Sequence, residues 1–251
     1  MKENSLKLLL NLVSKSGEQR SVRVTALKNT VFPNLKSSSF RSLLYLAKAR
    51  GWLDLQTVAG ERVIIGNRQA LTVLEPHFPA LLGVWDNWEG QWLSLVFNRP
   101  PKTDKQFRFL RNWCQAHHCL QLSRGVYLAP DVYLTNYLSE LKPIYDHSIY
   151  ILSSREWQND NVDQVAREKY QVVELSNQYS GISNQINGLL KIIDLQKKLD
   201  DQHIEQLPAL FERLFVAITA DLGVIRYYFP HLESVWSLIG GWQSLVGQAN
   251  Y

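Results

Sequence analysis

The sequence gathers cysteine and histidine in one short stretch, "CQAHHC" at residues 114–119. On a helix, Cys114, His117 and His118 would follow the spacing i, i+3, i+4, which could turn two or three of them toward one zinc ion. No second Cys/His pair at zinc-finger spacing follows in the sequence. We therefore interpret the stretch as a helix end with a buried cysteine, and we expect no metal and no other cofactor.

Motifs that would carry catalysis are missing from the sequence. It contains neither a glycine-rich phosphate loop nor a Gly-x-Ser-x-Gly nucleophile motif. The polar run "DDQH" at 200–203 is interpreted as a loop between helices with no catalytic partner. We predict that the protein is not an enzyme and has no catalytic residues.

A second set of side chains with functional chemistry lies in "KSSSFRSLLYLAKARGWL", residues 36–53. Ser37 is expected to cap the start of a helix here, and Gly51 to follow its end. One face of this helix would be buried through four apolar side chains at helical spacing: Phe40, Leu43, Leu44 and Ala47. The remaining surface would present cations and hydroxyl groups that suit phosphates and base edges: Lys36, Ser38, Arg41, Ser42, Tyr45 and Lys48.

The surroundings of this helix predict a winged helix-turn-helix domain over residues 1–80. Helical patterns at 4–15 and 24–32 precede it, and a β-hairpin around Ala59-Gly60-Glu61 follows, with Arg62 at its edge. Residues 1–75 hold 12 Lys and Arg against 5 Asp and Glu, whereas the remainder holds 15 against 18. We therefore predict that Arg62 and the exposed helix face contact double-stranded DNA. The alternative is an ordinary three-helix domain with a solvated polar face.

The rest of the chain predicts two further domains in an α+β multidomain protein. Residues 84–155 alternate strand patterns (91–98, 120–130, 147–154) with helix patterns (104–118, 131–144), which suits a ferredoxin-like sheet. Residues 156–251 are typical of an α-helical C-terminal domain, interrupted by Pro230 and by the Gly240-Gly241 pair. The two cysteines provide no disulfide framework, and no apolar run reaches the ~18 residues of a membrane span. We expect a cytoplasmic protein with no membrane partner.

A set of residues in the middle of the chain follows a known pattern: Trp88, Trp92 with Leu95 and Phe97, Pro100, Arg108 with Arg111, and "GVYLAP" at 125–130. In order and spacing these residues resemble the middle domain of the PaaX-like family of transcriptional repressors, which regulate phenylacetate degradation. "KSSSFRSLLYLAKARGWLDL" at 36–55 is similar to the Ser-x-Arg helix of that family. Trp157 and "REKY" at 167–170 match the opening of its C-terminal domain, whereas the family's later proline-rich motif is represented at best by "DLGVIRYYFP" at 221–230.

The resemblance implies a homodimeric repressor that binds a palindromic operator and releases it when an acyl- or aryl-CoA effector binds. It implies a middle domain similar to the small CRISPR-adaptation nucleases, which hold a divalent cation with an aspartate at the end of the first strand. The matching position here is Asn98, and a neutral amide is a poor ligand for a hard cation. Pro100 and Pro101 are expected to stop the strand. The alternative function is a nucleic-acid defence protein, a nuclease or an adaptor. No effector-binding residue is assigned.

Overall fold

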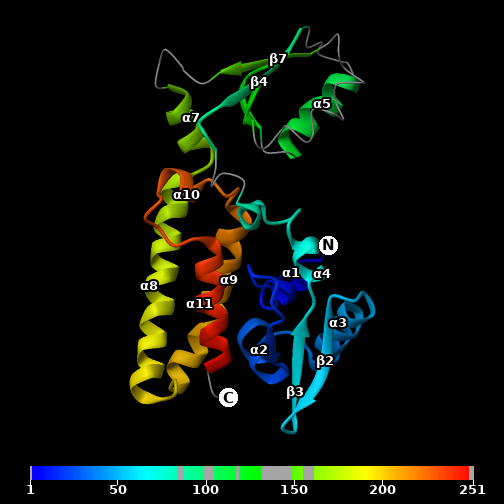
Figure 1. Ribbon diagram of the computed structural model, residues 1–251, viewed down its shortest axis with the longest axis vertical. Coiled ribbons are helices and arrows are strands. Elements are labelled where there is room, and N and C mark those ends of the chain that lie inside the picture. The colour runs from blue at the N-terminus through cyan, green and yellow to red at the C-terminus, as the bar shows by residue number, and fades with distance from the viewer. Residues whose placement is uncertain are drawn as a thin grey trace. The chain divides into compact units, whose positions relative to one another are not determined.

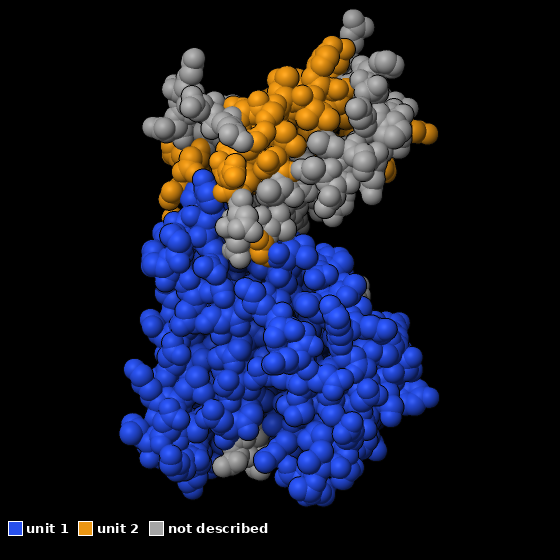
Figure 2. Space-filling view, in the orientation of Figure 1, with its two compact units in different colours: residues 1–82, 174–251 blue, residues 83–173 orange. Residues whose placement is uncertain are grey.

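The computed structural model describes residues 2–83, 88–98, 105–116, 119–131, 149–154 and 161–248. They form α-helices and two antiparallel β-sheets, so the protein belongs to the α+β class (Figure 1). The chain divides into two compact units, residues 1–82 with 174–251 and residues 83–173, which Figure 2 colours blue and orange. Among the described helices, none combines the length and the apolar character needed to cross a membrane.

The first unit begins with short helices around a small sheet. The helices are α1 (Glu3–Leu10), α2 (Val24–Val31), α3 (Ser37–Ala49), α4 (Gln69–Leu74) and the 3-10 helix η1 (Pro79–Leu82). The strands are β1 (Ser21–Arg23), β2 (Leu53–Val58) and β3 (Glu61–Gly66), in the order β1-β3-β2. Ala59 and Gly60 both have positive φ, 50° and 82°, which is the geometry of a tight two-residue hairpin turn. Glu61 therefore belongs to β3 rather than to the turn.

Helix α3 ends as the sequence predicts but begins differently. Gly51 has a φ of 71°. Its N–H donates to the carbonyl oxygen of Lys48 at 2.9 Å, and the N–H of Trp52 donates to the carbonyl oxygen of Ala47 at 3.0 Å. These two bonds form the glycine-dependent closure that satisfies the last carbonyls of a helix. Ser37 is the first residue of the helix, and the N-cap position belongs to Lys36, whose side chain makes no capping bond. The predicted Ser37 cap is therefore wrong.

The C-terminal helices complete the first unit: α8 (Val172–Gln196), α9 (Asp201–Ala220), α10 (Ile225–Tyr228) and α11 (Val235–Gln248). Hydrogen bonds join them to the end of α1. The indole N–H of Trp242 donates to Asn11 Oδ1 at 2.8 Å, and Gln243 Nε2 donates to the backbone oxygens of Leu10 at 3.1 Å and Val13 at 2.9 Å. The N-terminal elements and these helices thus share one core, while the three predicted domain ranges stay a prediction.

Two details of the C-terminal helices differ from the sequence-based expectation. Asp200 caps α9 by accepting the N–H of His203 at 2.8 Å, so "DDQH" opens a helix and is not a loop. Gly240 and Gly241 lie inside α11 instead of interrupting it. A Cβ at Gly241 would stand 3.0 Å from Ile186 Cγ2, so the glycine permits a close approach to α8. Pro230 does fall between α10 and α11.

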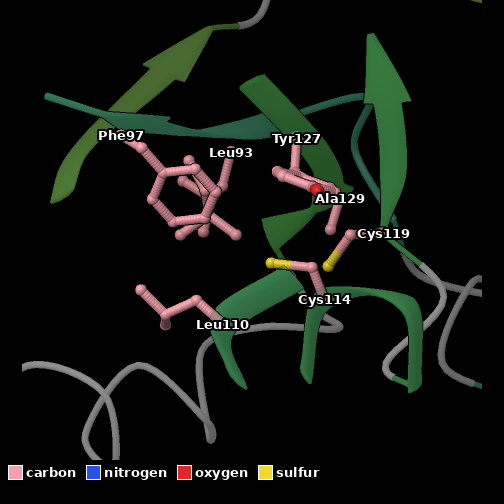
Figure 3. Close-up of a cluster of buried hydrophobic side chains, with 8 residues drawn as sticks. Leu93, Phe97, Leu110, Cys114, Cys119, Tyr127 and Ala129 are labelled. Carbon is pink, nitrogen blue, oxygen red and sulfur yellow. The ribbon is translucent and has the colours of Figure 1, made fainter. Parts of the chain in front are cut away.

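The second unit contains a four-stranded antiparallel sheet in the order β5-β6-β4-β7. Its elements are β4 (Trp92–Phe97), α5 (Lys105–Ala116), β5 (Leu120–Ser123), β6 (Val126–Pro130), β7 (Ile149–Ser154) and α7 (Asn161–Lys169). Alternate residues of β4, namely Leu93, Leu95 and Phe97, belong to one buried cluster with Leu110 and Cys114 of α5 (Figure 3). The predicted helix at 131–144 lies outside the described residues except for Asp131, so it stays a prediction. Pro100 and Pro101 also lie outside the described residues.

Candidate nucleic-acid interface

The predicted DNA-contacting side chains gather on the exposed surface of α3. Lys36, which precedes the helix, and Ser38, Arg41, Ser42, Tyr45 and Lys48 on it are all exposed. Tyr45 is 76% exposed, although an aromatic ring of this size is normally at least half-buried. Phe40, Leu44 and Ala47 are buried on the other side. The amphipathic pattern therefore positions the polar set as the sequence analysis expected.

Positive charge on this surface is not neutralised within the described part of the protein. Helix α3 contains no acidic residue. Among the described residues, Lys36, Arg41, Lys48 and Arg62 take part in no ion pair. Such cations keep their full attraction for an external polyanion.

Hydroxyl groups on the same surface differ in what they can offer a ligand. Ser42 Oγ donates to the backbone oxygen of Ser38 at 3.0 Å, one turn earlier. In this arrangement the Ser42 hydroxyl can still accept a hydrogen bond from a base or a water molecule, but it cannot donate one, because its proton is already bound to Ser38. Donation to phosphates would fall to Ser38, Tyr45 and the cations.

Arg62 lies near the tip of the hairpin and is exposed. Its strand, β3, is the central strand of the sheet, because β1 pairs with it on the side away from β2. The last pair with β1 is Arg23 with Val63, so Arg62 lies just beyond β1, opposite Thr57 of β2. Glu61 Oε2 is 2.8 Å from Arg23 Nε, so the charge around the hairpin tip is mixed. Arg62 thus belongs to the hairpin, as expected, at a position where β1 no longer pairs with β3.

One further cation, Arg50, lies at the end of α3 and is not among the residues predicted from the sequence. Its guanidinium carbon lies 4.8 Å from the centre of the Trp52 ring, and its side chain remains exposed. Stacking on an aromatic ring holds an arginine extended while leaving its N–H groups available. The signal for this residue was its place directly before the closing glycine of the helix, where a cation also complements the helix dipole.

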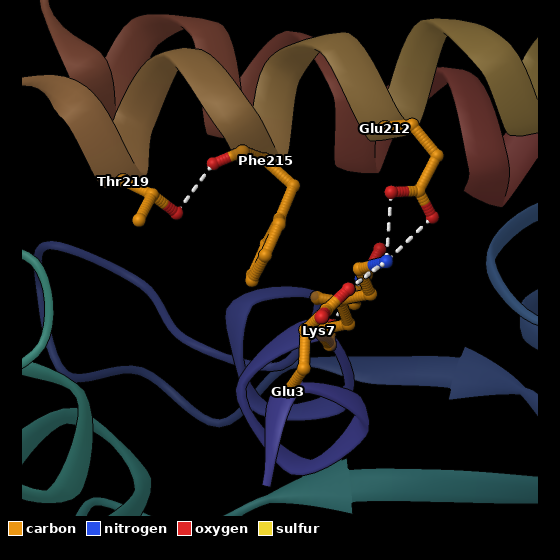
Figure 4. Close-up of polar contacts among 6 residues, drawn as sticks. Glu3, Lys7, Glu212, Phe215 and Thr219 are labelled. Atoms are coloured by element: carbon orange, nitrogen blue, oxygen red, sulfur yellow. Dashed lines mark hydrogen bonds and ion pairs between the residues drawn. The ribbon is translucent and has the colours of Figure 1, made fainter. Parts of the chain in front are cut away.

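The N-terminal elements contact α9 through Lys7, a buried lysine of α1. Lys7 Nζ is 2.7 Å from both carboxylate oxygens of Glu212 and 2.6 Å from Glu3 Oε1, and it stands 5.0 Å from the centre of the Phe215 ring (Figure 4). Burial by itself lowers the pKa of Lys7, but the bonds and charges of the two carboxylates together raise it above its usual value. Lys7 is thus held charged inside the unit.

A cavity of about 450 Å³ lies beside this ion cluster, between α1, the turn before α3, and α9. Apolar side chains such as Phe32 and Leu35 line it together with Lys7 and Glu212. Because Lys7 already binds two carboxylates, the cavity offers little attraction to an anionic ligand. We therefore do not assign a CoA thioester to it.

The positions considered for metal chemistry lie in the second unit. Asn98 follows β4 directly and is exposed, so an amide stands at the end of the strand. Cys114 is buried, whereas His117 and His118 lie outside the described residues. Within the described ranges, no group of three or more His, Cys, Asp or Glu residues is placed to hold a metal ion.

Comparisons with known proteins assign no family to the chain. No family model matches the sequence, and no curated protein matches it. Among solved structures, the chain is similar to the uncharacterized protein Rv0674 from Mycobacterium tuberculosis, with a TM-score of 0.43 and 13% sequence identity. The similarity covers 95% of this chain and 96% of that one. A TM-score of this size carries no argument about function.

Proposed function

We propose that the protein is a sequence-specific DNA-binding transcriptional repressor of the PaaX-like kind, acting as a homodimer. The observation that carries the proposal is the exposed surface of α3, where cations without ion-pair partners among the described residues alternate with hydroxyl-bearing side chains. Lysine and arginine on such a surface bind phosphates and fix the register of a protein on DNA. Arginine, serine and tyrosine also reach base edges in the major groove.

The order of elements in the N-terminal part supports a winged helix-turn-helix domain. A helix, a short strand, two helices joined by a five-residue connection and a β-hairpin follow one another as α1, β1, α2, α3, β2 and β3. In this arrangement α3 is the recognition helix that enters the major groove, and the hairpin is the wing. Arg62 on the wing would then contact the phosphate backbone beside the groove.

The strand order of the second unit supports a ferredoxin-like dimerisation domain. In chain order the four strands lie second, third, first and fourth across the sheet, all antiparallel to their neighbours, with α5 between the first two. Two copies related by a twofold axis would present two α3 helices to a palindromic operator, with half-sites one or more helical turns apart. Asn98 in place of a carboxylate favours such a regulator over the nuclease alternative.

The proposal includes release of DNA by an acyl- or aryl-CoA effector, which rests on the family resemblance. Such an effector lowers DNA affinity only if it binds the DNA-free geometry more tightly than the DNA-bound one. A hundredfold effect corresponds to about 3 kcal/mol of coupling free energy.

The test of the DNA interface is the double variant Arg41→Ala, Lys48→Ala, measured against the salt dependence of duplex DNA binding. Each lost phosphate contact reduces the slope of log K against log salt by about 0.9, so the variant should lose about 2 from the slope and bind weakly at every sequence. Fluorescence anisotropy with a labelled duplex gives both quantities.

A matched control removes the same charge from another part of the first unit. Lys191→Ala with Lys198→Ala changes two exposed lysines of α8 and the segment after it, and should leave the slope nearly unchanged. If both double variants lose the same amount, α3 is not the interface. An unchanged slope in the α3 variant would overturn the proposal.

A further inference from the structure

Cys114 and Cys119 lie together in the core of the second unit, and the chain contains no other cysteine. Cys114 is 1% exposed and Cys119 is 8% exposed, and neither forms a disulfide. Any disulfide within one chain must therefore join these two residues.

The backbone at the end of α5 brings the two cysteines into contact. The N–H of Cys119 donates to the carbonyl oxygen of Cys114 at 2.8 Å, a bond that spans five residues. At helix ends, a bond of this span sets the side chains of its first and last residues against each other. Figure 3 shows the two side chains next to one another beneath the sheet, within the same buried cluster. Joining the two sulfurs therefore needs side-chain rotation rather than movement of separate elements.

The buried cluster that contains the two thiols also contains a polar group without a hydrogen-bond partner among the described residues. The side chain of Tyr127 is fully buried, and its hydroxyl has no hydrogen-bond partner among the described residues. Burial, followed by the influence of Cys114, raises the pKa of this hydroxyl, with a smaller contribution from Cys119. A buried O–H donor in the same cluster as the two sulfurs suits an oxygen atom transiently attached to one of them.

We propose that Cys114 and Cys119 form a modification site, a dithiol that hydrogen peroxide converts into an intramolecular disulfide. This inference does not depend on DNA binding or on an effector. In the first step the sulfur of Cys119, the more exposed of the two, attacks one peroxide oxygen. The O–O bond breaks, one water leaves, and Cys119 becomes a sulfenic acid.

In the second step the sulfur of Cys114 attacks the sulfur of Cys119. The S–O bond breaks, the S–S bond forms, and the hydroxide leaves as a second water with the proton from Cys114. The two sulfurs together lose two electrons, and the peroxide gains them. The bond to Cys114 and burial raise the pKa of the Cys119 thiol, so its thiolate is scarce and the first step should be slower than for an exposed cysteine.

The experiment treats the native full-length chain with excess hydrogen peroxide, removes the peroxide with catalase, and unfolds the protein in guanidinium with N-ethylmaleimide. Intact mass should show a growing fraction that carries no adduct and is two hydrogen atoms lighter than the reduced chain. Dithiothreitol should return this fraction to two adducts. Cys114→Ser and Cys119→Ser, as matched controls, should never yield the lighter species.

Equilibrium in glutathione buffers measures whether the fold favours the bond. We expect the native chain to hold the disulfide at a ratio of disulfide to dithiol at least tenfold higher than the guanidinium-unfolded chain, equivalent to about 30 mV. An equal or lower ratio in the native chain would overturn the proposal. So would retention of two adducts after peroxide, oxygen addition without loss of both thiols, or disulfides only between chains.

Discussion

Trp242 lies on α11, and we expect it to stabilise the N-terminal helices as much as α11 itself. It is 1% exposed, and its indole N–H supplies the hydrogen bond to Asn11 Oδ1 at 2.8 Å. Asn11 in turn donates to the backbone oxygen of Lys7 at 2.7 Å, at the end of α1. Trp242→Phe keeps an aromatic ring near Phe211, whose ring centre lies 5.2 Å away, but removes the donor.

The magnitude follows from two contributions. An acceptor left buried without a donor costs about 1–3 kcal/mol. The smaller ring leaves a cavity that adds about 1 kcal/mol. We therefore expect the first unit to lose about 3 kcal/mol of unfolding free energy.

Hydrogen exchange of backbone amides tests whether this loss is shared. If residues 1–82 and the C-terminal helices unfold together, amides of α1, α2 and α11 that exchange through that unfolding should all lose protection by about 150-fold, the factor that corresponds to 3 kcal/mol. Trp236→Phe is the matched control. Its indole N–H donates to Leu81 O at 3.2 Å from a half-buried position, so its cost should stay below about 1 kcal/mol.

The refuting result is a loss of protection confined to α11. It would mean that the N-terminal elements keep their own stability, as independent domains do, and that the bond between Trp242 and Asn11 does not couple them.

Three further substitutions test contacts in the first unit. Gly66→Ala should lower the free energy of unfolding, measured in urea, by about 2 kcal/mol or more, because the new Cβ would lie 2.3 Å from the backbone oxygen of Leu12. A variant as stable as the wild type would contradict the close contact between β3 and the segment after α1. Gly188→Ala, on α8 with nothing within 4 Å of the new Cβ, should instead gain up to about 1 kcal/mol, and a loss would speak against helix at this position. The pKa of Tyr179 is raised well above its usual value, first by burial and then by the charge and hydrogen bond of Asp221. Above about pH 10 the unfolded chain therefore releases the Tyr179 proton, whereas the native state keeps it. Unfolding free energy should therefore fall between pH 10 and 11 more steeply in the wild type than in Tyr179→Phe, and equal slopes would refute the argument.

The sequence predicts α3 and the hairpin well because both are specified locally. A stripe of apolar residues at helical spacing, the glycine at position 51 and the tight turn at Ala59-Gly60 each act within a few residues. The exposed polar surface of α3 follows from the same stripe, since whatever does not face the core faces solvent. The three-residue strand β1 gives no pattern of its own, and it forms because β3 has a free edge.

Helix α1 shows where local reasoning ends. The apolar spacing predicts an amphipathic helix over 4–15, but the helix ends at Leu10, and the side chain of Asn11 bonds back to the preceding turn. Its polar residues Ser5 and Lys7 are buried together with Leu8, Leu9 and Leu10. For Lys7 the partner inside the unit is Glu212 of α9, which is 205 positions away in sequence. No periodicity within α1 carries that information.

The same junction determines what regulation of α3 would require. Helix α3 has one exposed surface and contacts α1, which is joined to α9 through Lys7 and Glu212, while α2 contacts both α9 and α11. A hundredfold change in DNA affinity needs only about 3 kcal/mol of difference between two states. A charge-assisted hydrogen bond contributes about 1.5–3 kcal/mol, and the half-exposed Glu212 puts its bond with Lys7 toward the lower end of that range. In the proposed repressor, loss of the Lys7 contact together with one other bond of the same junction, such as that of Trp242, would supply a free-energy difference of this size. An effector would not have to touch α3: it would need to bind more tightly to a geometry in which α9 has moved away from α1.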